Sequence, residues 1–125
     1  MTNFNKIFTQ DYLDSLLPKK TSDMFFEALY GDASEGAYDI SLLFIKTKNK
    51  KLFFEFNLKQ RKNKCLTCNL TYGLPEVFTR HPLININGMI TKIKEKGIKV
   101  KDWSLGATYE KSSSLHTIPL ILTIE

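Results

Sequence analysis

Three segments in the middle of the chain alternate apolar and polar residues, which is the period of β-strands. They are residues 38–47 (YDISLLFIKT), 51–59 (KLFFEFNLK) and 65–72 (CLTCNLTY). The residues that share the apolar faces are Tyr38, Ile40, Leu42, Phe44, Leu52, Phe54, Phe56, Leu58, Leu66, Cys68, Leu70 and Tyr72. Because short polar turns separate the segments, we predict an antiparallel meander of three strands.

Two further strands are predicted near the end of the sequence, at residues 98–110 and 116–124. The alternation in the first slips near Lys101 and Asp102, as it does at a β-bulge. The second contains Pro119, which has no N–H to donate to a neighbouring strand. We therefore expect the final strand to lie at an edge of the sheet or to be bulged at Pro119.

Three segments have the apolar spacing of helices. Residues 9–17 begin with Thr9 as a capping residue, and the following proline stops the helix. Residues 21–31 offer Thr21 or Ser22 as the N-terminal cap and a glycine at the C-terminal end. Residues 82–97 carry apolar side chains at helical spacing, and Pro82 suits the first helical position.

The order of these elements is a helix or helix pair, three strands, a helix and two strands. This order predicts a single α+β domain that covers residues 1–125. About five antiparallel strands are expected to form its sheet, as a three-strand meander and a two-strand hairpin. The N-terminal helices and the central helix would pack against that sheet.

The chain has 125 residues, of which 42% are apolar and 25% charged, as in average globular domains. The sequence contains no run of about 18 apolar residues, which is the length that a transmembrane helix requires. The net charge of +5 is unevenly distributed: residues 23–39 hold five acids and no base, whereas residues 46–64 hold eight bases and one acid. This asymmetry indicates either lysines that solvate turns or a surface for an anionic partner.

Cys65 and Cys68 form a C-x-x-C pair, and His81 and His116 would complete four possible zinc ligands. In a strand, side chains three positions apart point to opposite faces, so the two sulfur atoms would not converge on one ion. We therefore interpret both cysteines as structural and expect no metal and no cofactor. Two cysteines make no disulfide framework, which indicates a reducing compartment, the cytoplasm.

Residues 71–88 (TYGLPEVFTRHPLINING) contain the best candidate ligand site. Arg80 and His81 are expected just before a helix that begins at Pro82, where backbone N–H groups and the helix dipole favour an anion. The arginine would add a planar fork that suits carboxylate or phosphate. The polar residues that would complete the pocket are Glu76, Asn85 and Asn87.

The alternative interpretation makes the same stretch a connection into a helix. Thr79 or His81 would then cap the helix, and Arg80 would be solvated or paired with an acid from residues 23–39. The chain contains no G-x-S-x-G elbow, no phosphate-binding glycine loop and no H-E-x-x-H motif. We therefore expect no catalytic residue, and an enzyme with its pocket at Arg80 and His81 is a less favoured hypothesis.

Leu43, Ile45 and Phe53 fall on the opposite face of the predicted sheet from the main apolar residues. If helices cover only one face, these side chains form an exposed apolar strip of the kind found at protein interfaces. If the N-terminal helices cover the second face, the three side chains belong to the core. Strand edges near Pro119 could also pair with a partner.

A third hypothesis is that the basic segment 46–64 binds single-stranded nucleic acid together with Phe53. Its cationic residues are Lys48, Lys50, Lys51, Lys59, Arg61, Lys62 and Lys64. Most aromatic residues of the segment alternate inward, and the sequence has no recognisable nucleic-acid-binding motif. The favoured function is therefore that of a small cytoplasmic protein that associates with another protein or with a second copy of itself.

Overall fold

The computed structural model describes residues 4–18, 20–31, 36, 38–64 and 73–125. Its helices are α1 (Phe4–Ile7), α2 (Gln10–Leu16), α3 (Thr21–Tyr30), α4 (Leu74–Arg80) and α5 (Ile86–Lys94). Its strands are β1 (Tyr38–Lys48), β2 (Lys51–Gln60), β3 (Val100–Leu105), β4 (Tyr109–Ser112) and β5 (Leu115–Ile124). None of the helices within these ranges is long and apolar enough to cross a membrane.

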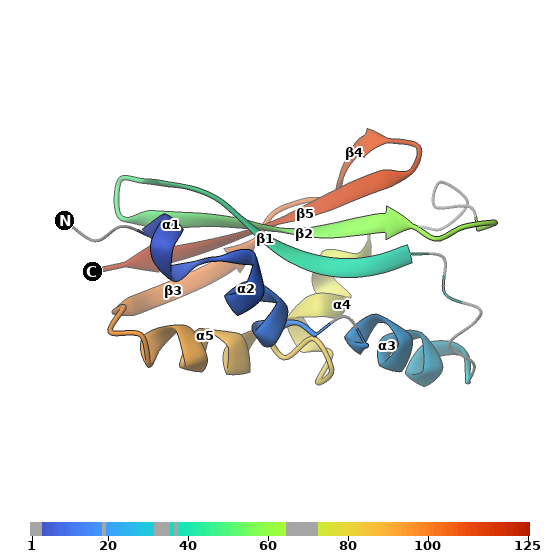
Figure 1. The fold of residues 1–125 in the computed structure, drawn as a ribbon, viewed down its shortest axis with the longest axis horizontal. Coiled ribbons are helices and arrows are strands. Elements are labelled where there is room, and N and C mark those ends of the chain that lie inside the picture. Colours follow the sequence, from blue (N-terminus) through green and yellow to red (C-terminus); the bar gives the residue numbers. More distant parts are fainter. Residues whose placement is uncertain (1–3, 19, 32–35, 37, 65–72) are drawn as a thin grey trace.

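The five strands form one antiparallel sheet in the order β1-β2-β5-β3, and β4 also pairs with β5. Helices α2, α3, α4 and α5 lie on the same side of this sheet (Figure 1). The predicted α+β class, with about five antiparallel strands packed against helices, is confirmed. The side chains that line the inner face of the two central strands are buried: Leu52, Phe54, Phe56, Leu58, Ile118, Leu120 and Leu122.

The connectivity differs from the expected meander, because the final strand lies in the middle of the sheet. β2 pairs with β1 along one side and with β5 along the other, so β5 occupies the position expected for a third meander strand. The strand expected at residues 65–72 lies outside the described residues. The prediction that the final strand is an edge strand is wrong.

Pro119 is tolerated in this central strand because its neighbour is interrupted there. The carbonyl of Pro119 accepts a hydrogen bond from the N–H of Gly106 (2.9 Å). In a strand the N–H and C=O of one residue point to the same side. The N–H that proline lacks would therefore point to the break between β3 and β4, where neither of these strands needs it. The irregularity expected in the last strand therefore lies in the segment opposite it.

Two bulges adjust the register of the β3–β5 and β1–β2 pairs, and a further shift lies between Glu110 and Ser112 in the β4–β5 pair. The pairing of β3 with β5 shifts between Val100 and Asp102, where the sequence predicts a bulge. A second shift occurs between Phe44 and Lys46 in β1 and leaves Ile45 as the extra residue. Phe44 keeps its ring on the inner face, where it contacts Phe54, while Ile45 is exposed.

The helix boundaries after β2 differ from the prediction. A short helix, α4, fills residues expected to be a connection, with Pro75 in its first turn and with Leu74 and Phe78 buried. The next helix, α5, begins at Ile86 rather than at Pro82. It starts late because Asn85 adopts a left-handed conformation and its side chain accepts a hydrogen bond from the N–H of Gly88 (3.2 Å).

The turn between β1 and β2 contains Asn49 and Lys50, both with positive φ (52° and 61°). Two positive φ values are the requirement of a type I′ turn, which prefers glycine at its second position. We expect Lys50→Gly to raise the free energy of unfolding by about 0.5–1 kcal/mol, because lysine is strained there. Urea denaturation followed by circular dichroism measures this change.

The control for this prediction is Lys51→Gly, one residue further along. Lys51 begins β2 in extended conformation, where glycine weakens a strand by roughly 0.5–1 kcal/mol. An equal loss of stability in both variants would contradict the turn assignment.

Candidate functional site

Arg80 and His81 lie at the C-terminal end of a helix, so the prediction that they lie just before a helix N-terminus is wrong. Arg80 is the last residue of α4 and His81 is its C-terminal cap. This end of a helix carries partial negative charge, which disfavours an anion. The guanidinium of Arg80 pairs with Glu76 one turn earlier (2.9 Å), and both side chains are exposed (77% and 73%).

The other residues of the expected pocket have separate structural roles. The Nδ1 atom of His81 accepts a hydrogen bond from the N–H of Leu83 (3.2 Å), and the imidazole packs edge-on against Phe25. Asn85 caps α5. Asn87 is in the first turn of α5 and lines a groove of about 290 Å³ between α5 and β3. Its Oδ1 accepts a hydrogen bond from the indole N–H of Trp103 (3.1 Å). Among the described contacts, Arg80 pairs with Glu76, whereas His81, Asn85 and Asn87 each bind other groups.

The possible zinc ligands can be placed only in part. Cys65 and Cys68 lie outside the described residues. His81 caps α4, whereas His116 is buried in β5 with its Nε2 4.0 Å from a carboxylate oxygen of Glu110. Within the described part of the chain, no three His, Cys, Asp or Glu side chains are grouped as metal ligands.

The sheet face opposite the helices carries an apolar strip. Ile45 is 48% exposed and Leu43 and Phe53 are half-buried, so the three residues predicted for an interface do lie outside the inner core. Pro119 and Ile121 join them, because Phe53 pairs with Ile121 and Glu55 with Pro119 in the register of β2 and β5. We call Leu43, Ile45, Phe53, Pro119 and Ile121 the open-face strip.

Sequence reasoning found the part of this strip that lies on the first hairpin and missed the part on β5. The alternation of residues 116–124 did place Pro119 and Ile121 on the outer side of their strand. Only the pairing of β5 with β2 brings them next to Phe53. The missing information was therefore the order of the strands.

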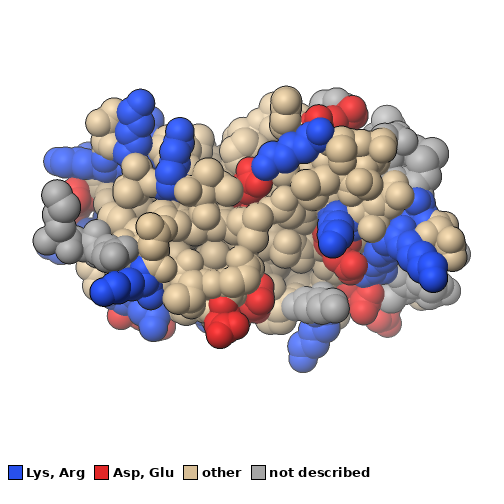
Figure 2. All heavy atoms as spheres, turned by 45° about the horizontal axis from the view of Figure 1, so that its top comes forward, with Lys and Arg blue, Asp and Glu red and all other residues tan. Residues whose placement is uncertain are grey.

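A cluster of three lysines borders the strip at the β1–β2 turn. Lys48 pairs directly with Lys51, and Lys46 pairs with Phe53, so the three side chains project from the same face as the strip. The ammonium group of Lys46 lies 5.3 Å from the centre of the Phe53 ring. Figure 2 shows a largely uncharged surface over the sheet, with lysine and arginine side chains gathered towards its two ends.

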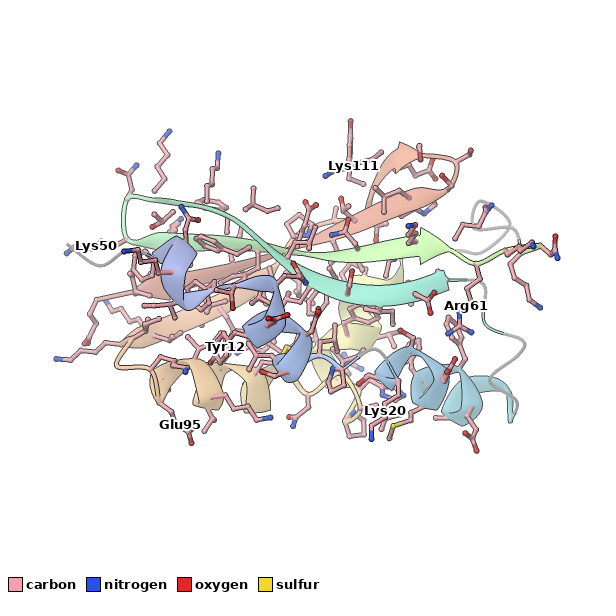
Figure 3. All side chains as sticks on the ribbon, in the orientation of Figure 1. Tyr12, Lys20, Lys50, Arg61, Glu95 and Lys111 are labelled. Carbon is pink, nitrogen blue, oxygen red and sulfur yellow. The ribbon has the colours of Figure 1, made fainter. Side chains whose placement is uncertain are left out.

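The basic residues proposed for nucleic-acid binding are divided between the two ends of the sheet. Lys48, Lys50 and Lys51 lie at the turn. Lys59 lies near the other end of β2, and Arg61, Lys62 and Lys64 follow that end. Lys51 and Lys59 are eight positions apart along β2, which separates the groups by about 26 Å. Lys50 and Arg61 lie at these opposite ends (Figure 3).

Arg61 is already engaged by acidic side chains. Its guanidinium pairs with Asp23 (2.7 Å) and Asp39 (3.0 Å) and lies over the ring of Phe26. The arginine side chain is only 18% exposed. Part of the acidic segment 23–39 therefore neutralises the basic segment within the protein itself.

The end of the open face beyond the strip is polar and more closed. Lys111 of β4 reaches over β5 to pair with Glu55 of β2 (2.9 Å), and the Glu55 side chain is 14% exposed. The next pair, Asn57 and Thr117, is buried. Among the described residues, no acceptor receives a hydrogen bond from the side-chain Nδ2 of Asn57.

The outer edge of β1 is closed by side chains from the helices. The hydroxyl of Ser22 accepts a hydrogen bond from the N–H of Ile40 (2.8 Å) and donates one to its C=O (3.4 Å). Gln10 donates to the C=O of Leu42 (3.1 Å). The N-terminal cap of α3 is Lys20, so the prediction that Thr21 or Ser22 caps this helix is wrong. Ser22 occupies backbone groups that would otherwise be open to an added strand.

No known protein family, no curated protein and no solved structure matches this chain. The candidate site is therefore defined by the geometry of the open-face strip and its bordering lysines.

We expect Ser22→Ala to lower the free energy of unfolding by about 1–3 kcal/mol, because it leaves the buried N–H and C=O of Ile40 without a partner. Urea denaturation measures the loss. The matched control is Ser15→Ala, which removes a hydroxyl from an exposed helix position and should change stability by less than about 0.5 kcal/mol. Similar effects of the two variants would contradict the role of Ser22.

We expect Asn57→Val to leave stability unchanged or to raise it by up to about 1 kcal/mol. Valine suits a buried strand position and removes a donor that has no acceptor among the described residues. Thermal and urea unfolding both report the change. The paired variant Asn57→Asp should be clearly destabilising, because it buries a charge. A marked loss with valine would show that the amide makes a stabilising contact.

Proposed function

We propose that this protein acts by binding another protein through the open-face strip. The observation that carries the proposal is the one-sided packing of the sheet. Helices α2 to α5 lie on one side, while Ile45, at 48% exposure, and its neighbours remain accessible on the other. Apolar side chains grouped on a solvent-facing surface are typical of protein interfaces.

The shape and chemistry of the strip suit a protein surface better than a small ligand. Its members come from three adjacent strands, and aliphatic side chains predominate. Such a surface gains free energy by the removal of apolar area from water, at about 25 cal/mol per Å². A helix face or another sheet can cover it, and a second copy of the chain is one such partner.

Association through the edge of the sheet is a less suitable mode at β1. Ser22 and Gln10 already bind the outward backbone groups of Ile40 and Leu42. A strand added beside these residues would have to displace both side chains. The proposal therefore concerns the face of the sheet and not its edge.

Nucleic-acid binding is supported by one observation, the placement of Lys46 over Phe53 beside two further lysines. Stacking of bases requires accessible aromatic faces, and the Phe53 ring already contacts a lysine of its own chain. The remaining residues of the strip are aliphatic or proline. We therefore treat nucleic acid as a competing outcome of the experiment.

The proposal predicts crosslinks from the strip and not from the helical side. The photoreactive residue p-benzoylphenylalanine is introduced at Phe53, or at the exposed helix position Lys92 as a control. Irradiation in the cells that produce the protein should give a discrete protein adduct only from position 53. Sedimentation velocity of the purified protein then shows whether the partner is a second copy.

The adduct must also depend on the strip itself. Ile121→Asp should remove it, because the substitution places a charge beside position 53 in the interface. Circular dichroism is used to confirm that the variant keeps its fold. Equal crosslinking from positions 53 and 92, or adducts that disappear on nuclease treatment, would contradict the proposal.

A further inference from the structure

We infer that the partner bound at the open-face strip is an acidic protein segment, whose carboxylates meet Lys46, Lys48 and Lys51. This inference rests on the proposed function and specifies the chemistry of the partner. Its basis is the clustering of these three lysines on one face beside the apolar strip, together with their absence from the ion pairs among the described residues.

The fold places the three ammonium groups close to one another. Lys48 and Lys51 are directly opposed across the β1–β2 pair, where side chains start about 5 Å apart. Lys46 precedes Lys48 on the same face, about 7 Å along the strand. Like charges at directly opposed positions destabilise a sheet, so an anionic partner would relieve a repulsion present in the free protein.

Four carboxylates within the described part of the chain, those of Asp23, Asp39, Glu55 and Glu76, pair with a lysine or an arginine. Arg61, Arg80 and Lys111 each contact an acid within 3.0 Å, whereas the ion pairs among the described residues include none of the three lysines. Asp102 lies two strands away from Lys51 in the register, about 10 Å by the spacing of strands. Its carboxylate accepts a hydrogen bond from the N–H of Trp103.

A second copy of the chain does not supply the required charge. If two strips packed face to face about a two-fold axis perpendicular to the strands, the lysine cluster of one copy would approach the Glu55 end of the other. About an axis parallel to the strands, the two lysine clusters would meet and repel each other. Glu55 is already paired with Lys111, and its neighbours Asn57 and Thr117 are uncharged. A different partner with carboxylates of its own is therefore the better complement.

The neighbouring apolar residues favour an acidic protein over a nucleic acid. Lys46 covers part of the Phe53 ring, and Leu43, Ile45 and Ile121 cannot stack with bases. The exposed ring of Tyr109 belongs to the other end of the face, because Tyr109 pairs with Thr117. A segment that combines apolar and acidic side chains can satisfy both the strip and the lysines.

Fluorescence anisotropy with defined probes tests this inference. The first probe is a fluorescein-labelled dodecapeptide of alternating leucine and glutamate. The comparison probes are the same peptide with lysine in place of glutamate, and a labelled thymidine dodecanucleotide. We expect the wild-type protein to prefer the acidic peptide and to lose affinity as sodium chloride rises from about 50 to about 300 mM.

The triple variant Lys46→Glu, Lys48→Glu, Lys51→Glu should weaken binding of the acidic peptide by at least about tenfold, since three ion pairs are replaced by repulsion. The matching Lys→Gln triple variant should give an intermediate loss. The control Lys20→Glu, Lys92→Glu, Lys94→Glu makes the same change in net charge on the helical side and should alter affinity by less than about twofold. Circular dichroism verifies the fold of each variant.

The variant Ile45→Ser, Ile121→Ser separates this inference from the proposed function. If it abolishes binding while the lysine reversal has no effect, the strip binds protein but the acidic preference is wrong. Equal affinity for the acidic and basic peptides would have the same meaning. If only the oligonucleotide binds, or neither peptide does, both the inference and the proposed protein interface are overturned.

Discussion

The pairing of β5 with β2 is the interaction on which the rest of the structure depends. It places the last strand of the chain in the middle of the sheet and aligns the inner-face residues of the two strands, such as Phe56 with Ile118. These side chains make up much of the buried core, and helices α2 to α5 lie on the same side of them. The free energy gained by this burial favours one register over its neighbours, because a slip of one residue would expose the whole apolar set.

The same pairing determines what the opposite face presents. Once β5 lies beside β2, Pro119 and Ile121 extend the apolar surface that begins at Leu43 and Phe53. Glu55 comes within reach of Lys111, and the polar pair of Asn57 and Thr117 closes that end of the face. The lysines of the β1–β2 turn border the other end. The surface is therefore divided into an apolar centre, a basic end and a polar end.

Helix side chains cover the edge of β1, whereas the open face remains accessible to solvent at Ile45. Helix side chains bind the outward backbone groups of Ile40 and Leu42, which reduces the tendency of this edge to accept another strand. The charge distribution follows a similar division. Asp23 and Asp39 neutralise Arg61 at one end of the sheet, while the cluster of Lys46, Lys48 and Lys51 has no ion pair among the described residues. Both features are consistent with the proposal that association uses the open face and not the edge of β1.

The sequence alone determined the features that arise from local geometry. Alternation showed which residues of β1, β2 and β5 face inward, and its slip near Lys101 indicated the bulge between Val100 and Asp102. Thr9 was correctly identified as a helix cap, because its hydroxyl acts within its own turn. The apolar outer positions of the first hairpin were also visible, since side-chain direction in a strand depends only on its neighbours.

Only the tertiary structure decided the order of the strands and the surroundings of each candidate residue. Pro119 suggested an edge strand, because proline cannot donate a backbone hydrogen bond. The break between β3 and β4 lies opposite Pro119, so neither of these strands requires a backbone hydrogen bond from it, and local sequence around Pro119 does not reveal this break. Arg80 and His81 were assigned to the wrong helix end because α4 is too short to show a periodic pattern and is held by the burial of Leu74 and Phe78. Strand order and short buried helices depend on contacts between distant segments, and the period of the sequence does not record such contacts.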